Sequence, residues 1–564
     1  MGAPRSAERG TARRKRQGKM FRRRPFVECM PLSAGTTLAL LLFGGLAFFF
    51  ASFVTLSSAR YTAPRRQLLE TRAVRPGYGP AYDAEVAARA RGGSVKNDDL
   101  SERRRAAVRE AMRHSWQGYK KYAYGEDELE PITRTGSNAF GHLGATAIDA
   151  IDTLWLMGLE KEYLEARELV ADFPKRMMEA SPLSTFECTI RVLGGFMSTY
   201  YLTGDELYLN NARELGDRLL FAYSRKGLGM PSGSVSLNEG YESYWHVNED
   251  FESHLLAEFG TTQLEFYALS KETGDMKYAK ASAKPLEAVH GMYPNSSLLP
   301  THFNNLGEII PPMRYTMGAM ADSYYEYLLK AWVQAGSHRD EMVHDTGRRW
   351  ERSMEAMSRF LVYRYKGFTA LQEVGGAFDE KVPNSHLGKI SKSMDHLSCF
   401  VPGMLGLGVY KARDLMTSSQ QVKFLKLAED LTQTCYLFYH STSTGLSGDA
   451  YSYHADKILP AGAQNLLRPE TVESLMILYR ATGNNKYREW GWEIFQAFEK
   501  HCKVEAGYSG VTDVTHPSAE LDNKMQSWFL AETLKYLYLL FSPSDVLSLD
   551  EWVFNTEAHP MMIW

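Results

Sequence analysis

Acidic side chains recur along this chain at or near the start of apolar stretches that are typical of helices. The densest pair is Glu470 and Glu473, which follow Arg468 and Pro469; proline favours the first helical position, so one helix face is predicted to carry both carboxylates. Two adjacent carboxylates repel unless a cation shares them, and Arg468 or a metal ion could do so. Paired carboxylates that act as general acid and general base are the apparatus of glycoside hydrolysis. The other residues that lead such stretches are Asp149, Asp152, Glu187, Glu258, Asp322, His396 and Glu532.

Each of these acids taken alone has a simpler interpretation. An acid in the first turn of a helix more often caps it or complements its dipole than performs chemistry. The recurrence of seven such stretches is what favours a shared acidic pocket. A helical-repeat scaffold whose acids are only caps is the alternative, and it predicts no metal site.

Composition and missing signatures exclude several other functions. The 64 basic and 67 acidic residues give no bias toward polyanions, so nucleic acid is not an expected partner. The sequence contains no zinc-protease motif, EF-hand loop, phosphate-binding glycine loop or nucleophile-elbow serine. None of the five cysteines is spaced as a Cys-x-x-Cys metal ligand. In an oxidising lumen Cys399 and Cys435 could pair, which would leave Cys188 and Cys502 as buried thiols.

Helical hairpins are the elements predicted to position these acids. Three turns look alike, in that a glycine can end one helix and the following Asp or Asn can start the next. Self-similar hairpins predict a helical repeat in which a ring of helices converges on the acidic pocket. The three turns are LTGDELY at 202–208, ETGDMKY at 272–278 and ATGNNKY at 481–487.

The amino-terminal region has a different character. Residues 1–30 are strongly basic, and residues 31–58 contain an uncharged core, 38–56, that is long enough to span a bilayer. Basic residues on the amino side predict a cytoplasmic tail, a transmembrane signal anchor and a lumenal remainder. A cleaved signal peptide is the alternative. Residues 59–100 are predicted to form a stem, and 101–564 the globular catalytic domain. In a lumen, Asn295 would be an N-glycosylation acceptor.

Several longer motifs resemble the class I α-1,2-mannosidases, glycoside hydrolase family 47. The resemblance runs from about residue 104 to the carboxyl end. The motifs that carry it are HSWQGY at 114–119, IDAIDTLW at 148–155, DSYYEY at 322–327, MDHL at 394–397, RPETVES at 468–474 and FNTEAHP at 554–560.

This resemblance implies an all-α fold, an (αα)7 barrel that a C-terminal β-hairpin plugs, with a calcium ion at its floor. Thr556 is the implied calcium ligand, through its hydroxyl and carbonyl oxygens. Glu470, Glu473, Glu532 and Glu557 would hydrogen-bond water molecules on that ion, because calcium prefers oxygen ligands and retains water.

The resemblance also implies the catalytic roles. Glu187 is the leading candidate for the general acid, Asp322 is the second candidate, and Glu470 is the base that activates water for inversion of the anomeric centre. Proton transfer through a water molecule leaves the choice between the two acids open.

Substrate-binding positions follow in the same way. Arg191, one helical turn after Glu187, would influence the ionisation of that carboxyl. The aromatic ring that packs beneath the sugar would be Trp528, where the family usually has Phe. The remaining implied substrate-binding residues are Glu258, His396, Arg468, Glu473, Glu532 and Glu557, and Cys399 with Cys435 matches the family's disulfide.

Two positions depart from the family pattern. Met320 stands where single-branch trimming members of the endoplasmic reticulum have Arg and Golgi-type members have an apolar residue, so branch selection is expected to be looser. The adjoining DSYY at 322–325 looks more like the reticulum type. Gln526 stands where Glu is usual.

The expected function is therefore calcium-dependent, inverting removal of α-1,2-linked mannose from high-mannose N-glycans. The enzyme is expected in the endoplasmic reticulum or Golgi membrane, as a single-pass type II protein with a lumenal catalytic domain. The alternative is a lectin-like quality-control factor that binds glycans and directs misfolded glycoproteins to degradation.

Overall fold

The computed structural model describes Ala90 and residues 97–564, apart from 224–226, 239–252, 337–342, 344, 366, 377–388 and 455–456. These residues belong to one compact unit, Arg72–Trp564. The predicted tail, membrane anchor and most of the stem lie outside the described residues. Within the described part, no helix is both long and apolar enough to cross a membrane.

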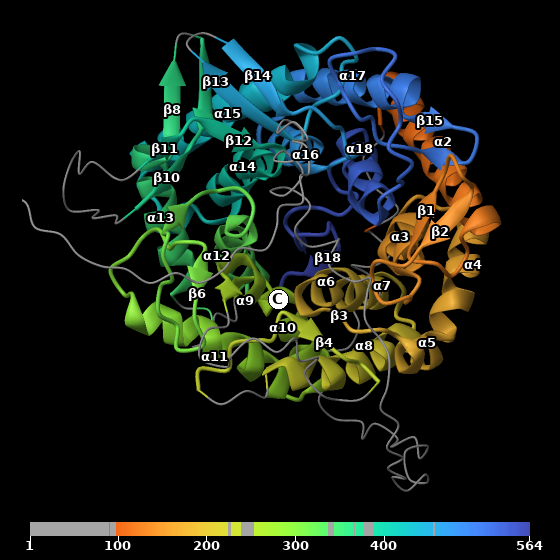
Figure 1. The fold of residues 1–564 in the computed structure, drawn as a ribbon, viewed down its shortest axis with the longest axis horizontal. Coiled ribbons are helices and arrows are strands. Elements are labelled where there is room, and N and C mark those ends of the chain that lie inside the picture. The colour runs from red at the N-terminus through yellow and green to blue at the C-terminus, as the bar shows by residue number, and fades with distance from the viewer. Residues whose placement is uncertain are drawn as a thin grey trace, which may run out of the picture. The chain divides into compact units, whose positions relative to one another are not determined.

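The described unit is predominantly helical, as the sequence predicts, and its helices pair along the chain (Figure 1). Each inner helix packs mainly against one outer helix, and the inner helices contact one another in a closed ring that η6 completes against α3. The seven inner elements of the described residues are α3 (Ala145–Leu156), α7 (Gly194–Thr203), α10 (Gln263–Thr273), α12 (Asp322–Gln334), α14 (Val401–Lys411), α16 (Glu470–Thr482) and α18 (Leu534–Leu540). Their outer partners, in the same order, are α4 (Glu160–Ala171), α8 (Glu206–Leu219), α11 (Lys277–Met292), α13 (Thr346–Phe360), α15 (Ser418–His440), α17 (Lys486–His501) and α2 (Asp99–Tyr122).

The repeated turns join inner to outer helices as predicted. Gly204, Gly274 and Gly483 end α7, α10 and α16 with positive φ angles of 68°, 70° and 70°, a conformation that costs glycine little. The next residue starts the outer helix: the Asp205 side chain accepts a hydrogen bond from the Leu207 amide. The same short sequence thus encodes the same reversal of direction three times.

The described residues also form short antiparallel strands. One hairpin, β17 (Trp552–Phe554) with β18 (Pro560–Met562), packs between inner helices, since β17 contacts α12 and β18 contacts α7. Figure 1 shows β18 inside the ring of helices, and the turn that joins it to β17 is residues 555–559. The other strands are β1 (Glu128–Glu130) with β2 (Thr135–Ser137), β3 (Leu183–Ser184) with β4 (Ser234–Val235), β5 (His254–Leu255) with β6 (His302–Phe303), β8 (Val362–Tyr365) with β9 (Phe368–Leu371), β15 (Lys503–Val504) with β16 (Gly507–Tyr508), and the triplets β11 (Ile390–Ser391), β10 (Glu373–Gly375), β7 (Arg314–Tyr315) and β12 (Ser393–Asp395), β13 (Ala450–His454), β14 (Lys457–Gly462).

The leading acids do not all begin their helices. Asp322 and Glu470 begin α12 and α16, but Asp149 and Asp152 lie inside α3, which begins four residues before Asp149. The reason is a cap from a distant residue: the Asp127 carboxylate accepts hydrogen bonds from the amides of Gly144 and Ala145. A cap that is 17 residues away leaves no local sequence signal.

Two inner segments are π-helical. Glu187 ends the short α6 (Thr185–Glu187), and η1 (Cys188–Leu193) follows it; Glu532 lies within η6 (Phe529–Thr533). Single π-turns inside α-helices are frequent at functional sites because the wider turn redirects side chains. Both segments carry residues for which the sequence predicts a function.

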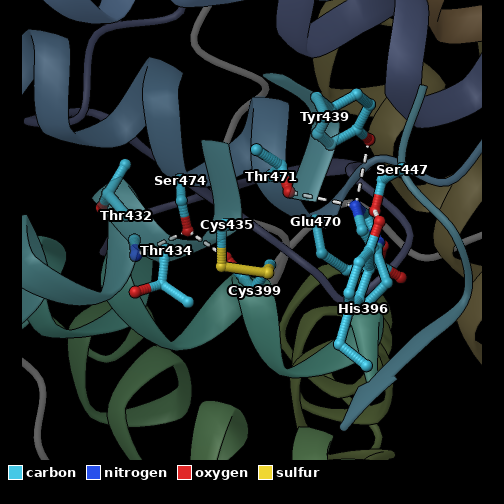
Figure 2. Close-up of a disulfide and its surroundings, with 12 residues drawn as sticks. His396, Cys399, Thr432, Thr434, Cys435, Tyr439, Ser447, Glu470, Thr471 and Ser474 are labelled. Atoms are coloured by element: carbon cyan, nitrogen blue, oxygen red, sulfur yellow. Dashed lines mark hydrogen bonds and ion pairs between the residues drawn. A yellow bond between two sulfur atoms is a disulfide. The ribbon is translucent and has the colours of Figure 1, made fainter. Parts of the chain in front are cut away.

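The pairing of Cys399 with Cys435 is confirmed, with an S–S distance of 2.08 Å and a Cα–Cα distance of 5.9 Å. Cys399 lies in η4 (His396–Phe400) and Cys435 in α15, so the bond fixes an outer helix to the segment that begins with His396 (Figure 2). Cys188 and Cys502 are free and buried, as expected.

Candidate active site

His396 and Glu470 form a hydrogen-bonded pair at the start of two neighbouring inner segments. The His396 Nδ1 atom lies 2.8 Å from Glu470 Oε2, and its Nε2 atom lies 3.0 Å from the hydroxyls of both Tyr439 and Thr471 (Figure 2). A carboxylate only accepts, so Nδ1 carries a proton in this arrangement. Burial opposes ionisation of Glu470, but the hydrogen bond from His396 and the charge of Arg468 outweigh it and lower the pKa of Glu470.

Arg468 and Arg191 both lie against the Trp528 ring system. Their guanidinium carbons are 5.5 Å and 5.4 Å from its centroid, within the range of cation–π attraction. The indole Nε1 donates to the Leu466 carbonyl at 3.0 Å, and Asp449 accepts from Arg468 Nε at 2.5 Å. Both guanidinium groups and the Leu466 carbonyl therefore hold the half-buried Trp528 ring in place.

Arg191 joins three acidic side chains that are far apart in the sequence. Its Nε donates to Glu187 at 2.8 Å, and its Nη1 donates to Asp149 at 3.2 Å and to Glu557. The predicted pairing of Arg191 with Glu187 one turn away is present even though the connecting segment is π-helical. Phe140 also lies beneath the guanidinium, 5.2 Å from ring centroid to carbon.

Asp322 has the opposite electrostatic environment from Glu470. Burial and the nearby charges of Glu326, Asp395 and Glu470 raise the pKa of Asp322 to about 7, although the Ser323 amide donates to its Oδ1 at 2.9 Å. Glu470 and Asp322 are thus carboxyls that hold different protonation states near neutral pH.

Three further glutamates of the site, Glu473, Glu532 and Glu557, are buried. Burial, together with the charges of neighbouring carboxylates, raises the pKa of Glu473 to about 7 and that of Glu557 to about 8, and it also raises the pKa of Glu532. Lys330 and Arg191 are the basic groups that oppose these shifts. A cation placed near these carboxyls would favour their ionised form, so this region suits a positive ion.

Thr556 lies in the hairpin turn directly before Glu557. Asn555 organises this turn: its Oδ1 accepts from the amides of Glu557 and His559 at 2.9 Å and 2.8 Å. Lys535 donates to the Ala558 carbonyl at 2.8 Å. The Thr556 amide lies 3.3 Å from the Tyr327 hydroxyl, so the turn is fixed to α12 as well.

The donor set around this turn suits a hard cation that keeps much of its water. In the described residues no group of three or more His, Cys, Asp or Glu side chains is placed to hold a metal ion directly. The fit therefore depends on the Thr556 oxygens, with the buried carboxyls of Glu473, Glu532 and Glu557 as acceptors for water.

Glu258 and the backbone of Met320 lie in adjoining segments near Glu187. Burial and the charge of Glu187 raise the pKa of Glu258 to about 7. Glu258 belongs to α9 (Leu256–Gly260), and the amide of Ala257 donates to the Met320 carbonyl at 3.0 Å. Met320 has a φ of 79° and leaves 38% of its surface exposed, so its side chain is accessible to a ligand.

Some residues of the site have no counterpart among the sequence predictions. Asp449 orients Arg468 through its side chain, and its carbonyl accepts from the His396 amide at 2.9 Å. Asp395 is close enough to Asp322 to raise its pKa. His559 lies between Asp149 and Asp152, at 3.3 Å and 2.8 Å. Only the positions of Asp395 and His559 within distinctive motifs could have drawn attention to them.

Two carboxyls whose environments shift their pKa values in opposite directions are the arrangement that glycoside hydrolases use. Residues 111–563 match the sequence profile of Glycosyl hydrolase family 47. The chain belongs to this family.

Similar proteins agree with that assignment. The chain is 46% identical to mannosyl-oligosaccharide 1,2-alpha-mannosidase MNS1 of Arabidopsis thaliana over 83% of this chain and 80% of that protein. It is 40% identical to the endoplasmic reticulum mannosyl-oligosaccharide 1,2-alpha-mannosidase of Homo sapiens over 82% of this chain and 64% of that protein. Among solved structures, alpha-1,2-mannosidase from Trichoderma reesei superposes with a TM-score of 0.73 at 25% identity, covering 82% of this chain and 99% of that one.

Proposed function

We propose that this protein is a calcium-dependent, inverting α-1,2-mannosidase that trims high-mannose N-glycans in the early secretory pathway. The observation that carries the proposal is the pair of Glu470, with a lowered pKa, and Asp322, with a pKa near 7, in a family of glycosyl hydrolases. The relatives named above are mannosyl-oligosaccharide 1,2-alpha-mannosidases, which supports mannose as the sugar removed.

Glu470 is proposed as the general base. Its carboxylate is ionised because His396 donates a hydrogen bond to it and Arg468 places a positive charge nearby. An ionised carboxylate can take a proton from a water molecule as that water attacks the anomeric carbon. In an inverting mechanism the general acid acts from the other face of the sugar.

The general acid must be protonated when it meets the glycosidic oxygen. Asp322 meets this requirement up to about pH 7. Glu187, the leading candidate from the sequence, becomes the second candidate here: Arg191 holds it at 2.8 Å beside Glu557 and close to Glu258. We assign the proton donor to Asp322 on the strength of its pKa and treat Glu187 as a residue that binds and orients the sugar.

This assignment predicts the pH dependence of turnover. A proton on Asp322 is required, so kcat is expected to fall as the pH rises through about 7. Asp322→Asn is expected to lower kcat by about 10²- to 10⁴-fold and to abolish that alkaline limb. The measurement is a pH profile of kcat between pH 5 and pH 9.

Glu258→Gln is the matched control, because the pKa of Glu258 is also raised to about 7. It should preserve the alkaline limb. A limb that persists in Asp322→Asn and disappears in Glu187→Gln would transfer the acid role to Glu187.

Substrate binding is proposed to use the aromatic ring and the two arginines around it. Trp528 would stack against the apolar face of the mannose ring, while Arg468 donates to its hydroxyls. His396 would act on the sugar through Glu470, because its Nδ1 proton is directed at that carboxylate. Arg191, Glu258, Glu473, Glu532 and Glu557 would complete the polar lining. Met320 would contact the next sugars only through van der Waals packing, so several branches of the glycan should be accepted.

Calcium is the proposed cofactor, with Thr556 as its protein ligand. When bound it would supply positive charge to the buried carboxyls and fix the floor on which the sugar rests. Glu473, Glu532 and Glu557 would orient its water molecules and, through them, the hydroxyls of the mannose.

The cellular setting is also a proposal. Residues 31–58 would anchor the protein as a single-pass type II protein of the endoplasmic reticulum or Golgi, with 59–100 as stem and the helical domain in the lumen. The Cys399–Cys435 bond supports an oxidising compartment. Asn295 is exposed, so an oligosaccharide transferase could reach this acceptor.

The test of the function is a time course with a nine-mannose N-glycan, in the presence of calcium or a chelator, with separation of the product isomers. Calcium-dependent release of mannose from several branches supports the proposal and the interpretation of Met320. One dominant eight-mannose isomer would contradict the loose branch selection. Binding without any trimming would favour the lectin-like alternative.

A further inference from the structure

A buried lysine lies close to the proposed calcium ligand and to the acidic floor, by which we mean the buried carboxyls of Glu473, Glu532 and Glu557. Lys330 lies on α12 and is 1% exposed. Its ammonium group donates to the Glu326 carboxylate one turn earlier, lies 3.4 Å from Glu473 Oε1, and lies 3.5 Å from the Asn555 carbonyl. A fully buried ammonium group is costly unless such partners compensate it.

The position of Lys330 relates it directly to the hairpin turn. Asn555 is the residue before Thr556, and Tyr327, three residues before Lys330 on the same helix, contacts the Thr556 amide through its hydroxyl at 3.3 Å. The side chains of α12 therefore contact the turn on both sides of the peptide bond that joins Asn555 to Thr556.

We propose that Lys330 is a built-in counter-cation of the calcium site: it limits the affinity for calcium and stabilises the acidic floor when calcium is absent. This inference rests on the proposed calcium dependence. It assigns no direct contact with sugar to Lys330.

The first effect, a lower affinity for calcium, follows from the positive charge of Lys330. A positive lysine near a divalent cation repels it, and the repulsion is large where little water separates the charges. Lys330→Gln removes the charge but retains an amide that can donate to the Asn555 carbonyl. We expect this variant to bind calcium about tenfold more tightly.

The second effect concerns the stability of the calcium-free protein, which the loss of Lys330 is expected to lower. Removing one partner of a buried ion pair leaves the other charge without compensation, which is strongly destabilising. Glu326 and Glu473 both lose their cation in Lys330→Gln, so the calcium-free variant should melt at a lower temperature than the wild type. Bound calcium would compensate, and the calcium-induced increase in Tm should therefore be larger in the variant.

Neutralising an acidic residue as well as Lys330 makes the inference falsifiable even if Lys330→Gln folds poorly. Glu326→Gln removes one negative charge and leaves Lys330 charged, so calcium affinity should weaken about tenfold. The double variant with both glutamines restores the original net charge and should bind calcium approximately as the wild type does. Lys426→Gln is the control, because Lys426 pairs with Asp430 on the exposed face of α15, with 67% of its side chain accessible.

The experiment titrates calcium chloride into the full-length chain in detergent by calorimetry and records Tm with calcium and with a chelator. Tighter binding in Lys330→Gln, weaker binding in Glu326→Gln and unchanged binding in Lys426→Gln are expected. Unchanged or weaker calcium affinity in Lys330→Gln would overturn this inference but not the proposed cofactor. If Lys330→Gln does not fold, unchanged calcium affinity in Glu326→Gln would overturn it in the same way. A wild type that binds no calcium overturns the proposed cofactor and the inference together.

Discussion

Glu470→Gln is expected to lower kcat by about 10²- to 10⁴-fold, with a much smaller effect on KM. Glutamine is nearly isosteric and its carbonyl oxygen can still accept from His396, which lies 2.8 Å from the native carboxylate. Arg468 retains Asp449 as its ionic partner. The substitution therefore removes the ability to accept a proton while leaving the surrounding contacts in place. Steady-state kinetics on a mannose-terminated glycan measure the effect.

Two controls accompany this variant. Its Tm should match that of the wild type within a few degrees, which separates a chemical loss from misfolding. Glu493→Gln, on the outer helix α17, should leave kcat unchanged because the Glu493 side chain is 52% exposed and contacts His440 and Tyr436 rather than any residue of the candidate site. Normal turnover in Glu470→Gln would refute the base assignment.

Removing calcium is expected to abolish turnover and to destabilise the fold in a pH-dependent manner. Saturation at about 1,000 times Kd contributes about 4 kcal/mol of stability, or on the order of 4 °C in Tm for a domain of this size. The pKa values of Glu473 and Glu557 are raised to about 7 and about 8, mainly by burial. Without calcium, these groups favour the folded state at low pH, and that contribution is lost as the pH rises from the ordinary carboxyl range to about 8.

The measurement is thermal unfolding with calcium and with chelator at pH 6 and pH 8. The calcium-induced increase in Tm should be larger at pH 8, where the floor carboxyls must ionise. Equal melting temperatures with and without calcium at both pH values would favour the scaffold interpretation, in which the acids only cap helices.

Local sequence signals predicted the helical framework well, because their causes are local. Gly204, Gly274 and Gly483 end helices through their own backbone freedom, and the following Asp or Asn caps through contacts two residues away. The pairing of Glu187 with Arg191 is equally local. These features follow from spacing alone.

Other parts of the site depend on contacts between distant residues, which spacing does not reveal. Asp127 caps α3 from 17 positions away, and for that reason the helix begins before Asp149 rather than at it. The π-helical turns at η1 and η6 leave no local signal in the sequence. In the sequence, Lys330 is a single basic residue in a largely apolar helix. Only the fold places Glu473 and the Asn555 carbonyl beside it.

The most direct test of the central claim is the stereochemistry of the first mannose released. Proton NMR of the reaction mixture, recorded within minutes of adding enzyme to an α-1,2-linked mannose substrate, distinguishes the two anomers before they equilibrate. An inverting enzyme with Glu470 as base releases β-mannose first. Initial release of α-mannose would mean that a carboxylate acts as nucleophile, and would contradict the proposed roles of Glu470 and Asp322.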